Sequence, residues 1–402
     1  MDSFEVIAGK SKAFEKFHLL SVCTVFPTRN NPTFGLFVKR RLEAIAKHVP
    51  VRILNPQPCF PFLRPQVEDS QLSNDRNAVD IRPMFYIPKV ANHWNGFWLE
   101  RCVSKWLSNM PAQDLRNSVL DAHFGYPEGV GCYRAARKHQ LPLFITVRGL
   151  ETELMTVPSI KRQMLEAFDY ATGIISVSDF LKEMLVANGV PSEKVTVIGN
   201  GVDSVVYSPG DKELSRRLIG IEPATRLIVA VGNVQRRKGY DVLIDALKAF
   251  QETKNLVCAI IGGVNEKQTL EQLKAQVSDL GSPTQVRFLG QQTPDVIAEW
   301  LRAADVFVLP TRREGCCNAV LEALSSGTPV ISTPAGDNTK FVEDYRNGFI
   351  VPFEDSASLA SAITKSLDLA WDSKLISDSV REHTWDGAAG KVIEYVGARL
   401  AQ

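Results

Sequence analysis

The sequence predicts an α/β protein of two Rossmann-like domains, each with a parallel sheet, facing a central cleft. Short β-branched apolar runs alternate with amphipathic segments, as in sheets covered by helices on both faces. A Pro/Gly turn, "SPGDK" at 208–212, interrupts this alternation, and a second βαβ series follows it. A chain of 402 residues is also long for one core. We expect domains at 1–208 and 209–380, and a helix at 381–402 that packs back on the body.

The first half contains short apolar runs that predict buried strands. We expect strands at 18–26, 51–56, 141–147 and 173–178, and helices at 35–48 and 128–140. "VLDAHF" at 119–124 is a further strand, so that His123 lies near its carboxyl end.

The second half repeats this alternation more regularly. We expect strands at 226–232, 256–263, 286–290, 306–310 and 329–333, helices at 239–252, 266–280, 293–304 and 318–325, and a closing amphipathic helix at 383–402. Ligands of such sheets bind at the carboxyl ends of the strands, so the loops after these strands are the first place to look for a site.

Composition excludes several classes of protein. The net charge of +1 does not favour nucleic-acid binding, and no apolar run is long enough for a transmembrane helix. The charged start lacks the apolar core of a signal peptide, and seven cysteines without a C-x-x-C pair fit a reducing compartment. We therefore expect a cytoplasmic protein. No D-x-D motif occurs, so we expect no metal held by two close aspartates. We also expect no other metal site and no cofactor.

The stretch "TRREGCCNAVLEALSSG" places two carboxylates, Glu314 and Glu322, around the start of a helix. Asn318 is a candidate N-cap and Gly327 a candidate residue just past the helix end. Helix N-termini attract anions, and flanking carboxylates suit hydroxyl groups on both sides of a phosphate. A nucleotide sugar has this layout. The alternative is that both glutamates are solvated acids without a function.

Other loops on the predicted ligand edges carry polar residues. Arg237 and Lys238 follow a strand and could hold a diphosphate, although a basic loop is often only solvated surface. Gly35 precedes a helix in the first half, where backbone amides could approach an anion. Arg148 and Glu151 end a strand beside that of His123, and a structural role for the histidine is the alternative to a functional one.

The two adjacent cysteines predict no chemistry of their own, and the tryptophan-rich segment 92–110 has two interpretations. Cys316 and Cys317 are adjacent, which disfavours a disulfide, and they lack the neighbours of a zinc site. The segment 92–110 mixes three tryptophans with basic residues. Such a segment can dock at a membrane surface, where a lipid-linked acceptor would lie, or it can be a helix with its tryptophans in the core.

Taken together, these motifs resemble the retaining glycosyltransferases of family 4, which have the GT-B fold. "EGCCNAVLEALSSGTPV" is similar to the family pattern E-G-F-G-x-x-x-x-E-A-x-x-x-G-x-P-V, and "VIGNGVD" to V-I-P-N-G-V-D. "VGNVQRRKGYDVLIDAL" is similar to V-G-R-L-x-x-x-K-G-x-D-x-L-I-x-A. "AHFGYPEG" and "NPTFGLFVKRR" resemble segments of members that build surface polysaccharides. The likeness covers nearly the whole chain from about residue 18.

The resemblance implies a role for each matching residue. Glu322 would bind the donor ribose, Glu314 the transferred sugar, and Lys238 the diphosphate, with His123 near the reaction centre. The implied catalytic set is therefore Glu314, His123 and Lys238. The implied donor-binding set is Glu322, Gly232, Asn233, Arg237, Lys238, Gly315, Cys316, Cys317, Asn318, Ala319 and Gly35, and Arg148 and Glu151 would lie on the acceptor side.

Two positions depart from the family pattern. Asn233 stands where the family has arginine after V-G, which removes one cation from the diphosphate site. Cys316 and Cys317 stand where the family has Phe-Gly.

The resemblance implies metal-independent hexosyl transfer from a UDP- or GDP-sugar to a glycan or lipid-linked acceptor. The anomeric configuration would be retained by front-face attack, in which a phosphate oxygen accepts the acceptor proton. The enzyme would work in the cytoplasm or at the cytoplasmic face of the membrane. The alternatives are a nucleotide-sugar epimerase or hydrolase on the same fold, and a degenerate protein that only binds nucleotide sugars.

Overall fold

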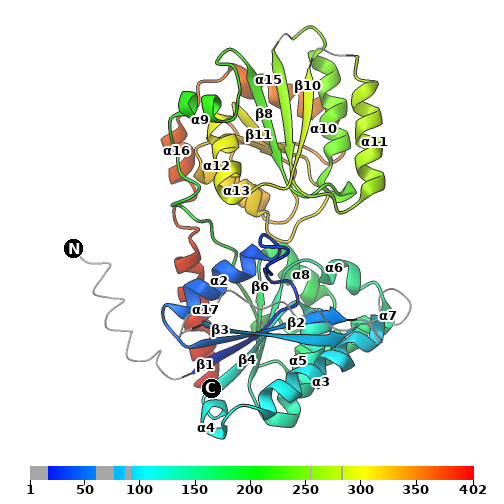
Figure 1. Ribbon diagram of the computed structural model, residues 1–402, viewed down its shortest axis with the longest axis vertical. Coiled ribbons are helices and arrows are strands. Elements are labelled where there is room, and N and C mark those ends of the chain that lie inside the picture. Colours follow the sequence, from blue (N-terminus) through cyan, green and yellow to red (C-terminus); the bar gives the residue numbers. More distant parts are fainter. Residues whose placement is uncertain (1–16, 60–76, 87–91, 254, 282–283) are drawn as a thin grey trace, which may run out of the picture. The chain divides into compact units, whose positions relative to one another are not determined.

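The computed structural model describes residues 17–59, 77–86, 92–253, 255–281 and 284–402 (Figure 1). The chain forms two compact units. Unit 1 contains the residues up to Asn200 together with Trp385–Gln402, and unit 2 contains Gly201–Thr384. The chain therefore leaves unit 1, builds unit 2, and returns to unit 1 for its last helix.

The sheet of unit 1 has seven parallel strands among the described residues, in the order β3-β2-β1-β4-β5-β6-β7. The strands are β1 (His18–Val22), β2 (Val51–Cys59), β3 (Asn77–Phe85), β4 (Ser118–His123), β5 (Leu143–Val147), β6 (Gly173–Ser176) and β7 (Val195–Val197). The order of connection reverses between the neighbours β1 and β4, which places the topological switch point of this sheet there.

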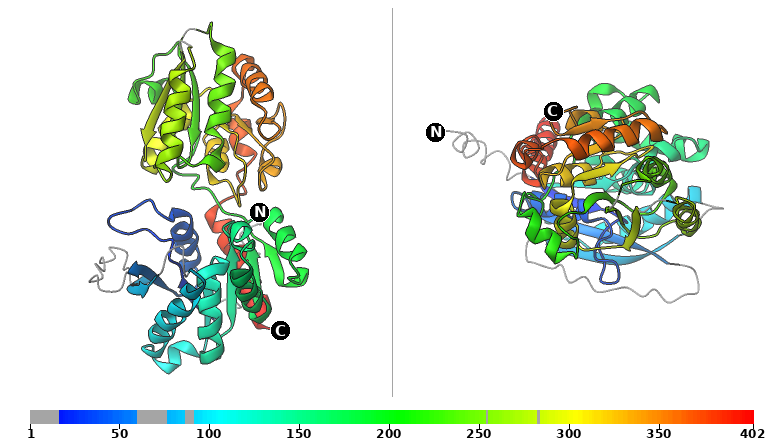
Figure 2. Two further views of the ribbon diagram at one scale, coloured as in Figure 1. Left: turned by 90° about the vertical axis from the view of Figure 1, so that its right-hand side faces the viewer. Right: turned by 90° about the horizontal axis from the view of Figure 1, so that it is seen from above.

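Helices cover both faces of this sheet (Figures 1 and 2). They are α2 (Leu36–Ala46), α3 (Asn95–Ser108), α4 (Ala112–Leu115), α5 (Val130–His139), α6 (Glu151–Leu154), α7 (Pro158–Tyr170), α8 (Asp179–Ala187) and α17 (Trp385–Leu400), with short turns η2 (Asn92–Trp94), η3 (Gly125–Gly129) and η4 (Ser192–Lys194). Side chains of a strand alternate between faces, and both faces are buried here, which explains the continuous apolar runs of the sequence.

The closing helix α17 packs against α2 on one face of this sheet (Figure 1). Its Ala389, Val392 and Val396 share one buried core with Val38 and Leu42 of α2. Burial of such side chains contributes on the order of 2 kcal/mol each. The last residues of the chain are therefore part of the core of its first half.

The sheet of unit 2 has six parallel strands within the described residues, in the order β10-β9-β8-β11-β12-β13. They are β8 (Arg226–Val231), β9 (Leu256–Ile261), β10 (Gln285–Gly290), β11 (Val306–Leu309), β12 (Val330–Ser332) and β13 (Gly348–Ile350). The order reverses between β8 and β11, so the switch point of this sheet lies between them.

The helices of unit 2 connect or flank its strands, and some of their ends have recognisable caps. They are α9 (Lys212–Leu218), α10 (Tyr240–Leu247), α11 (Lys267–Ser278), α12 (Pro294–Ala303), α13 (Asn318–Ser325), α14 (Asn338–Phe341), α15 (Ser356–Asp368) and α16 (Ser373–Asp378), with turns η5 (Arg236–Lys238) and η6 (Lys248–Phe250). The Asp211 carboxylate accepts the N–H of Leu214 at the start of α9. Gly327, at φ 79°, ends α13 in a Schellman motif, as its sequence position predicts.

The predicted fold class is confirmed, and the elements differ mainly at their ends. β1 stops at Val22, four residues before the apolar run does, because Cys23 starts the loop toward α2. The predicted helix 239–252 is split into α10 and η6. The strands β3, β7 and β13 were not predicted from their patterns. Among the described residues, no helix is long and apolar enough to cross a membrane.

Candidate active site

In unit 2, the predicted site residues gather at the switch point between β8 and β11. The loop after β8 carries Gly232, Asn233, Arg237 and Lys238, and the loop after β11 carries Glu314. Parallel strands end at a common edge, so two loops 76 residues apart in sequence meet there.

Glu314 is the centre of this cluster. One carboxylate oxygen accepts from Lys238 Nζ at 2.7 Å and from the Thr311 hydroxyl at 2.9 Å, and the other accepts from Arg237 Nη1 at 3.1 Å. Burial alone would raise the pKa of Glu314, but Lys238 and Arg237 lower it below its ordinary value. The carboxylate is therefore ionised, and it fixes two cations at the end of the sheet.

A glycine makes the close approach of these loops possible. Gly239 has φ 72°, and a Cβ at this position would lie 1.9 Å from the carbonyl oxygen of Pro310. Gly232 is also constrained, because a Cβ there would lie 2.9 Å from the Lys238 side chain. The Tyr240 hydroxyl donates to the Gly232 carbonyl at 2.7 Å and holds this turn in place.

Helix α13 follows Glu314 and carries the second predicted glutamate. The helix starts at Asn318, and Cys317 is its N-cap, without a side-chain hydrogen bond. The predicted N-cap role of Asn318 is therefore wrong by one residue. Glu322 lies half-buried one turn into the helix.

The loop before α13 carries two adjacent cysteines that differ in burial. Gly315, Cys316 and Ala319 are half-buried, whereas Cys317 is buried. Burial raises the pKa of the Cys317 thiol to about 12. This thiol is protonated at neutral pH, as expected for a side chain that only fills space.

Asn233 is exposed, and its side chain forms a hydrogen bond with the loop after the neighbouring strand β9. Its side-chain oxygen accepts the N–H of Gly263, two residues past the end of β9, at 3.1 Å. The asparagine thus fixes the loop after β9, and it adds no positive charge beside Lys238.

In unit 1, the switch point is occupied by a cluster of buried polar side chains. His123, at the end of β4, lies 3.0 Å through Nε2 from Asp121, which accepts from the Ser21 hydroxyl at 3.0 Å. The other ring nitrogen, Nδ1, accepts from Arg148 at 3.0–3.2 Å. Burial lowers the pKa of His123 in spite of Asp121, so the ring is neutral at pH 7.

The two charged residues after β5, Arg148 and Glu151, also form hydrogen bonds within unit 1. The Arg148 guanidinium donates to Asn200 at 3.0 Å as well as to His123. Glu151 is fully buried, and it accepts the backbone N–H groups of Gly125, Arg148 and Gly149 at 2.8–3.1 Å. The geometry favours a positioning role for both residues, and their acceptor-side role stays a prediction.

Gly35 is the counterpart of Gly239 in this unit. It precedes α2 with φ 72°, and a Cβ here would lie 2.2 Å from the carbonyl oxygen of Val25. The position requires glycine, and an anion-binding role for its amide stays a prediction.

Sequence reasoning missed several polar residues of these sites. Asp121 lies two residues before His123 on β4, so the two-residue period of a strand could have found it. Thr311 and Arg312 lie in the loop between β11 and Glu314, and Arg312 binds Asp241 of α10 at 2.7–2.8 Å. Glu128 of "YPEG" is a further such residue, and its carboxylate accepts the N–H and the hydroxyl of Thr24.

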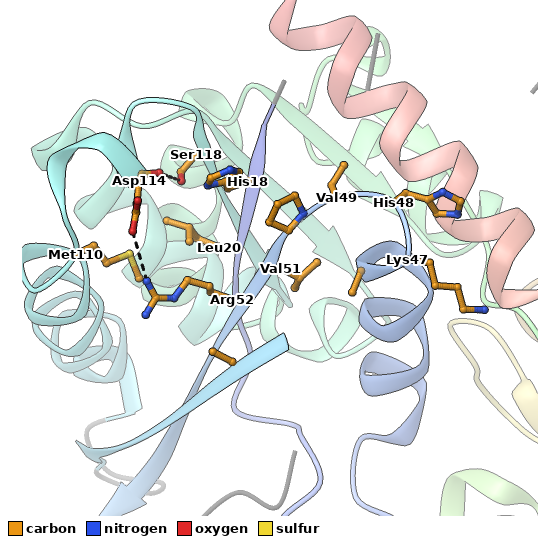
Figure 3. A pocket seen from close by; sticks show the side chains of 13 residues that line it. His18, Leu20, Lys47, His48, Val49, Val51, Arg52, Met110, Asp114 and Ser118 are labelled. Carbon is orange, nitrogen blue, oxygen red and sulfur yellow. Dashed lines mark hydrogen bonds and ion pairs between the residues drawn. The ribbon is translucent and has the colours of Figure 1, made fainter. Parts of the chain in front are cut away.

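A cavity of about 500 Å³ lies at the carboxyl edge of the unit 1 sheet. Its walls come from the loops after β1, β4 and β5 and from β2 and β3, and they include Thr24, Met84, Tyr126 and Glu128. A larger cavity, about 830 Å³, opens at the opposite, amino edge of the same sheet. Figure 3 shows Arg52 directed at Asp114 there, 3.9 Å away.

The tryptophan segment is mainly part of the core. Trp106 is buried in α3, and its indole N–H donates to Asp80 at 2.6 Å. Trp98 packs edge-on against Phe85, whereas Trp94 is half exposed.

Comparison with known proteins agrees with this architecture. Residues 37–205 match the model described as Glycosyltransferase Family 4, and residues 211–378 match that of Glycosyl transferases group 1. The putative teichuronic acid biosynthesis glycosyltransferase TuaC of Bacillus subtilis is 26% identical, over 86% of this chain and 88% of its own length. A D-inositol 3-phosphate glycosyltransferase of Jonesia denitrificans is 31% identical, but the match spans only 53% of its length.

Solved structures share the fold over almost the whole chain. Sucrose-phosphate synthase from Thermosynechococcus elongatus has a TM-score of 0.79 at 18% identity, with 96% of this chain and 99% of that chain covered. HepE of Anabaena, solved in complex with UDP and glucose, has a TM-score of 0.74 at 18% identity, with 95% and 100% covered. With its two Rossmann-like units and both family models matched, the chain belongs to the family 4, group 1 glycosyltransferases of the GT-B fold.

Proposed function

We propose that this protein is a retaining glycosyltransferase that moves a sugar from a nucleoside-diphosphate sugar to a hydroxyl group of a glycan or lipid-linked oligosaccharide. The observation that carries the proposal is the cluster of Lys238 and Arg237 on Glu314 at the switch point of unit 2. Two cations beside one carboxylate leave a net positive charge for a diphosphate.

The donor would be bound by unit 2. Lys238 and Arg237 would contact the diphosphate, Glu322 the ribose, and Glu314 the transferred sugar. Gly35 and His123 of unit 1 keep the donor and reaction-centre roles that the family resemblance implies. The complex of HepE with UDP supports a UDP-sugar, and a GDP-sugar is the alternative.

The chemistry would depend on stabilising the leaving group. The bond from the anomeric carbon to the phosphate oxygen breaks, a bond to the acceptor oxygen forms on the same face, and the departing phosphate takes the acceptor proton. Positive charge from Lys238 and Arg237 would stabilise the negative charge that develops on that phosphate. Because two side chains would supply this charge, we expect transfer to continue after treatment with EDTA.

The acceptor is proposed to belong to surface polysaccharide biosynthesis. The name of TuaC, which matches most of this chain, supports that assignment. Work at the cytoplasmic face of a membrane, with peripheral contact near the half-exposed Trp94, is part of this proposal.

A panel of nucleotides tests the donor assignment. We expect UDP or GDP, measured by calorimetry, to bind the wild-type protein, and Glu322→Gln to weaken that binding about tenfold or more by removing a charged acceptor for the ribose hydroxyls. Glu343→Gln is the matched control, since Glu343 is an exposed carboxylate of unit 2 paired with Arg346.

The anomeric configuration of the product, read by NMR, tests retention. Absence of binding by every nucleoside diphosphate, or equal binding by Glu322→Gln and the wild type, would contradict the donor site. An inverted product would contradict the mechanism alone.

A further inference from the structure

Arg312 joins three segments at the carboxyl edge of the unit 2 sheet. Its guanidinium forms a fork on Asp241 of α10, in which Nη1 donates to one carboxylate oxygen at 2.8 Å and Nη2 to the other at 2.7 Å. Nη1 also donates to the carbonyl oxygen of Arg236 at 2.5 Å, and Nη2 donates to Glu354, past the end of β13, at 2.8 Å. One side chain from the loop after β11 therefore holds the segments that follow β8 and β13.

The backbone of Arg312 is bonded to the same turn, η5. Its N–H donates to the carbonyl oxygen of Arg237 at 2.8 Å, so both carbonyls that precede Lys238 accept from one residue. Lys238 and Arg237 in turn bond to the carboxylate of Glu314. A displacement of Arg312 would therefore move the turn that carries both cations of the candidate donor site.

The charge of Arg312 is balanced by two carboxylates. Burial alone would raise the pKa of Asp241, but the hydrogen bonds from Arg312 lower it below its ordinary value. The hydrogen bonds to Asp241 and Glu354 raise the pKa of Arg312. Arg312 thus lies between two carboxylates, whereas Arg237 and Lys238 share one. The positive charge that a diphosphate could use therefore comes from Arg237 and Lys238.

A fork of this kind fixes direction as well as distance. Guanidinium and carboxylate groups are both planar, so two parallel N–H···O bonds define the orientation of one group on the other. A lysine at the same position would keep the charge, but its ammonium is a point charge on a flexible stem and cannot reproduce the fork. The substitution Arg312→Lys therefore separates the position of the turn from the charge beside it.

We propose that Arg312 is a positioning residue of the donor site, which holds the turn η5 against the loop of Glu314 and so places Lys238 and Arg237 for the diphosphate. The inference rests on the proposed function, since it concerns the same diphosphate site. Arg312 acts through Lys238 and Arg237 and does not contact the donor itself. Asp241 fixes the orientation of Arg312, which extends the supporting residues of the site to α10.

The first test needs no nucleotide and uses NMR of protein labelled isotopically at its lysine side-chain nitrogens. Lys238 Nζ is buried and bonded to Glu314, so we expect its ammonium protons to exchange slowly enough to be observed, and Lys238→Ala assigns the signal. We expect Arg312→Lys and Asp241→Asn each to shift or broaden this signal, because the turn that carries Lys238 loses its anchor.

The second test measures the binding of UDP and GDP by calorimetry, with Arg312→Lys made in the wild type and in Lys238→Ala. In the wild type we expect affinity to fall about fivefold. In Lys238→Ala we expect a fall of about twofold or less, because only Arg237 is left to be positioned. A direct contact between Arg312 and the nucleotide predicts equal losses in both backgrounds, and a purely structural role predicts no loss in either folded protein.

Arg346→Lys is the matched control, because it makes the same exchange at an exposed arginine of unit 2 paired with Glu343. It is expected to leave the lysine signal and the affinity unchanged. An unchanged Lys238 signal in both Arg312→Lys and Asp241→Asn, or no such signal in the wild type, would overturn the inference. Equal losses of affinity in the two backgrounds, or none, would overturn it as well. Failure of UDP and GDP to bind the wild type would instead count against the proposed function, and the Lys238 signal would then decide the inference.

Discussion

The two switch points of this molecule share a backbone design but differ in chemistry. In both units a left-handed glycine, Gly35 or Gly239, precedes the helix that follows the first strand of the sheet, with φ 72°, and lies against a backbone carbonyl. In unit 2 the neighbouring loops hold Lys238 and Arg237 on Glu314. In unit 1 the equivalent edge has a neutral, buried histidine between Asp121 and Arg148.

This difference shows that topology determines where a site forms, and loops determine what it binds. The cations of unit 2 are held by one carboxylate, with Lys238 buried and Arg237 partly exposed. Arg148 of unit 1 instead donates to His123 and Asn200. We therefore expect a cation removed from unit 2 to affect ligand binding, and a cation removed from unit 1 to affect stability.

The largest effect is expected for Lys238→Ala, which removes a cation of the unit 2 site. Transfer should fall about 100-fold or more, because the charge on the departing phosphate loses its partner. Initial rates with a radiolabelled donor measure this. Lys248→Ala, at an exposed lysine of unit 2 paired with Asp245, is the control.

Arg148→Met removes the corresponding cation of unit 1. We expect this variant to have a lower free energy of unfolding and an unchanged affinity for UDP. Transfer by Lys238→Ala at a rate close to that of the wild type would break the contrast between the units.

The next largest effects are expected at Gly35 and Gly239. Gly239→Ala and Gly35→Ala should each lower the free energy of unfolding by about 3 kcal/mol or more, because the new methyl group meets a carbonyl at 1.9 or 2.2 Å in addition to the unfavourable φ. Urea unfolding measures this.

Gly220→Ala and Gly189→Ala isolate the cost of φ alone, since both glycines have positive φ with no atom within 4 Å of the added Cβ. These two substitutions should each lower the free energy of unfolding by only about 1 kcal/mol. Equal losses at all four positions would show that the close approaches do not matter.

Glu128 gives unit 1 a pH dependence that we do not expect at Glu314. Burial raises the pKa of Glu128 to about 7, with a smaller contribution from Glu151, from an ordinary value of 4.5. The folded protein therefore holds a proton that the unfolded chain releases. This contribution to stability is complete below pH 4.5 and is lost as the pH rises to about 7.

The free energy of unfolding should fall by about 3 kcal/mol over that pH range, and Glu128→Gln should abolish this dependence on pH. The difference between the two unfolding curves, recorded against pH, measures the effect. Parallel curves would contradict a raised pKa.

The smallest effect is expected for Asn233→Arg, which adds a cation to the unit 2 edge. Affinity for the nucleoside diphosphate should rise by up to about tenfold, less the cost of losing the bond to the Gly263 N–H. Calorimetry measures this change. Weaker binding would mean that the loop after β9 depends more on Asn233 than the ligand gains from the added charge.

The sequence predicted the parallel sheets and the unit 2 cluster because both depend on local patterns. Continuous apolar runs indicated the buried strands, and Lys238 and Glu314 each follow such a run. β3 could not be found in this way, because Asp80, Arg82 and Pro83 interrupt its apolar pattern. The hydrogen bonds that join His123 to Asn200 through Arg148 link residues 77 positions apart, which no local pattern reports.

The return of the chain to unit 1 has a consequence for biosynthesis. Ala389, Val392 and Val396 of α17 belong to the same core as residues of α2. On the ribosome, the first half of the sequence emerges long before these side chains do. The core of unit 1 therefore remains incomplete while unit 2 is translated. We expect the nascent first unit to expose an apolar strip beside α2 throughout that interval. We therefore expect a chaperone to bind this unit until α17 has been translated.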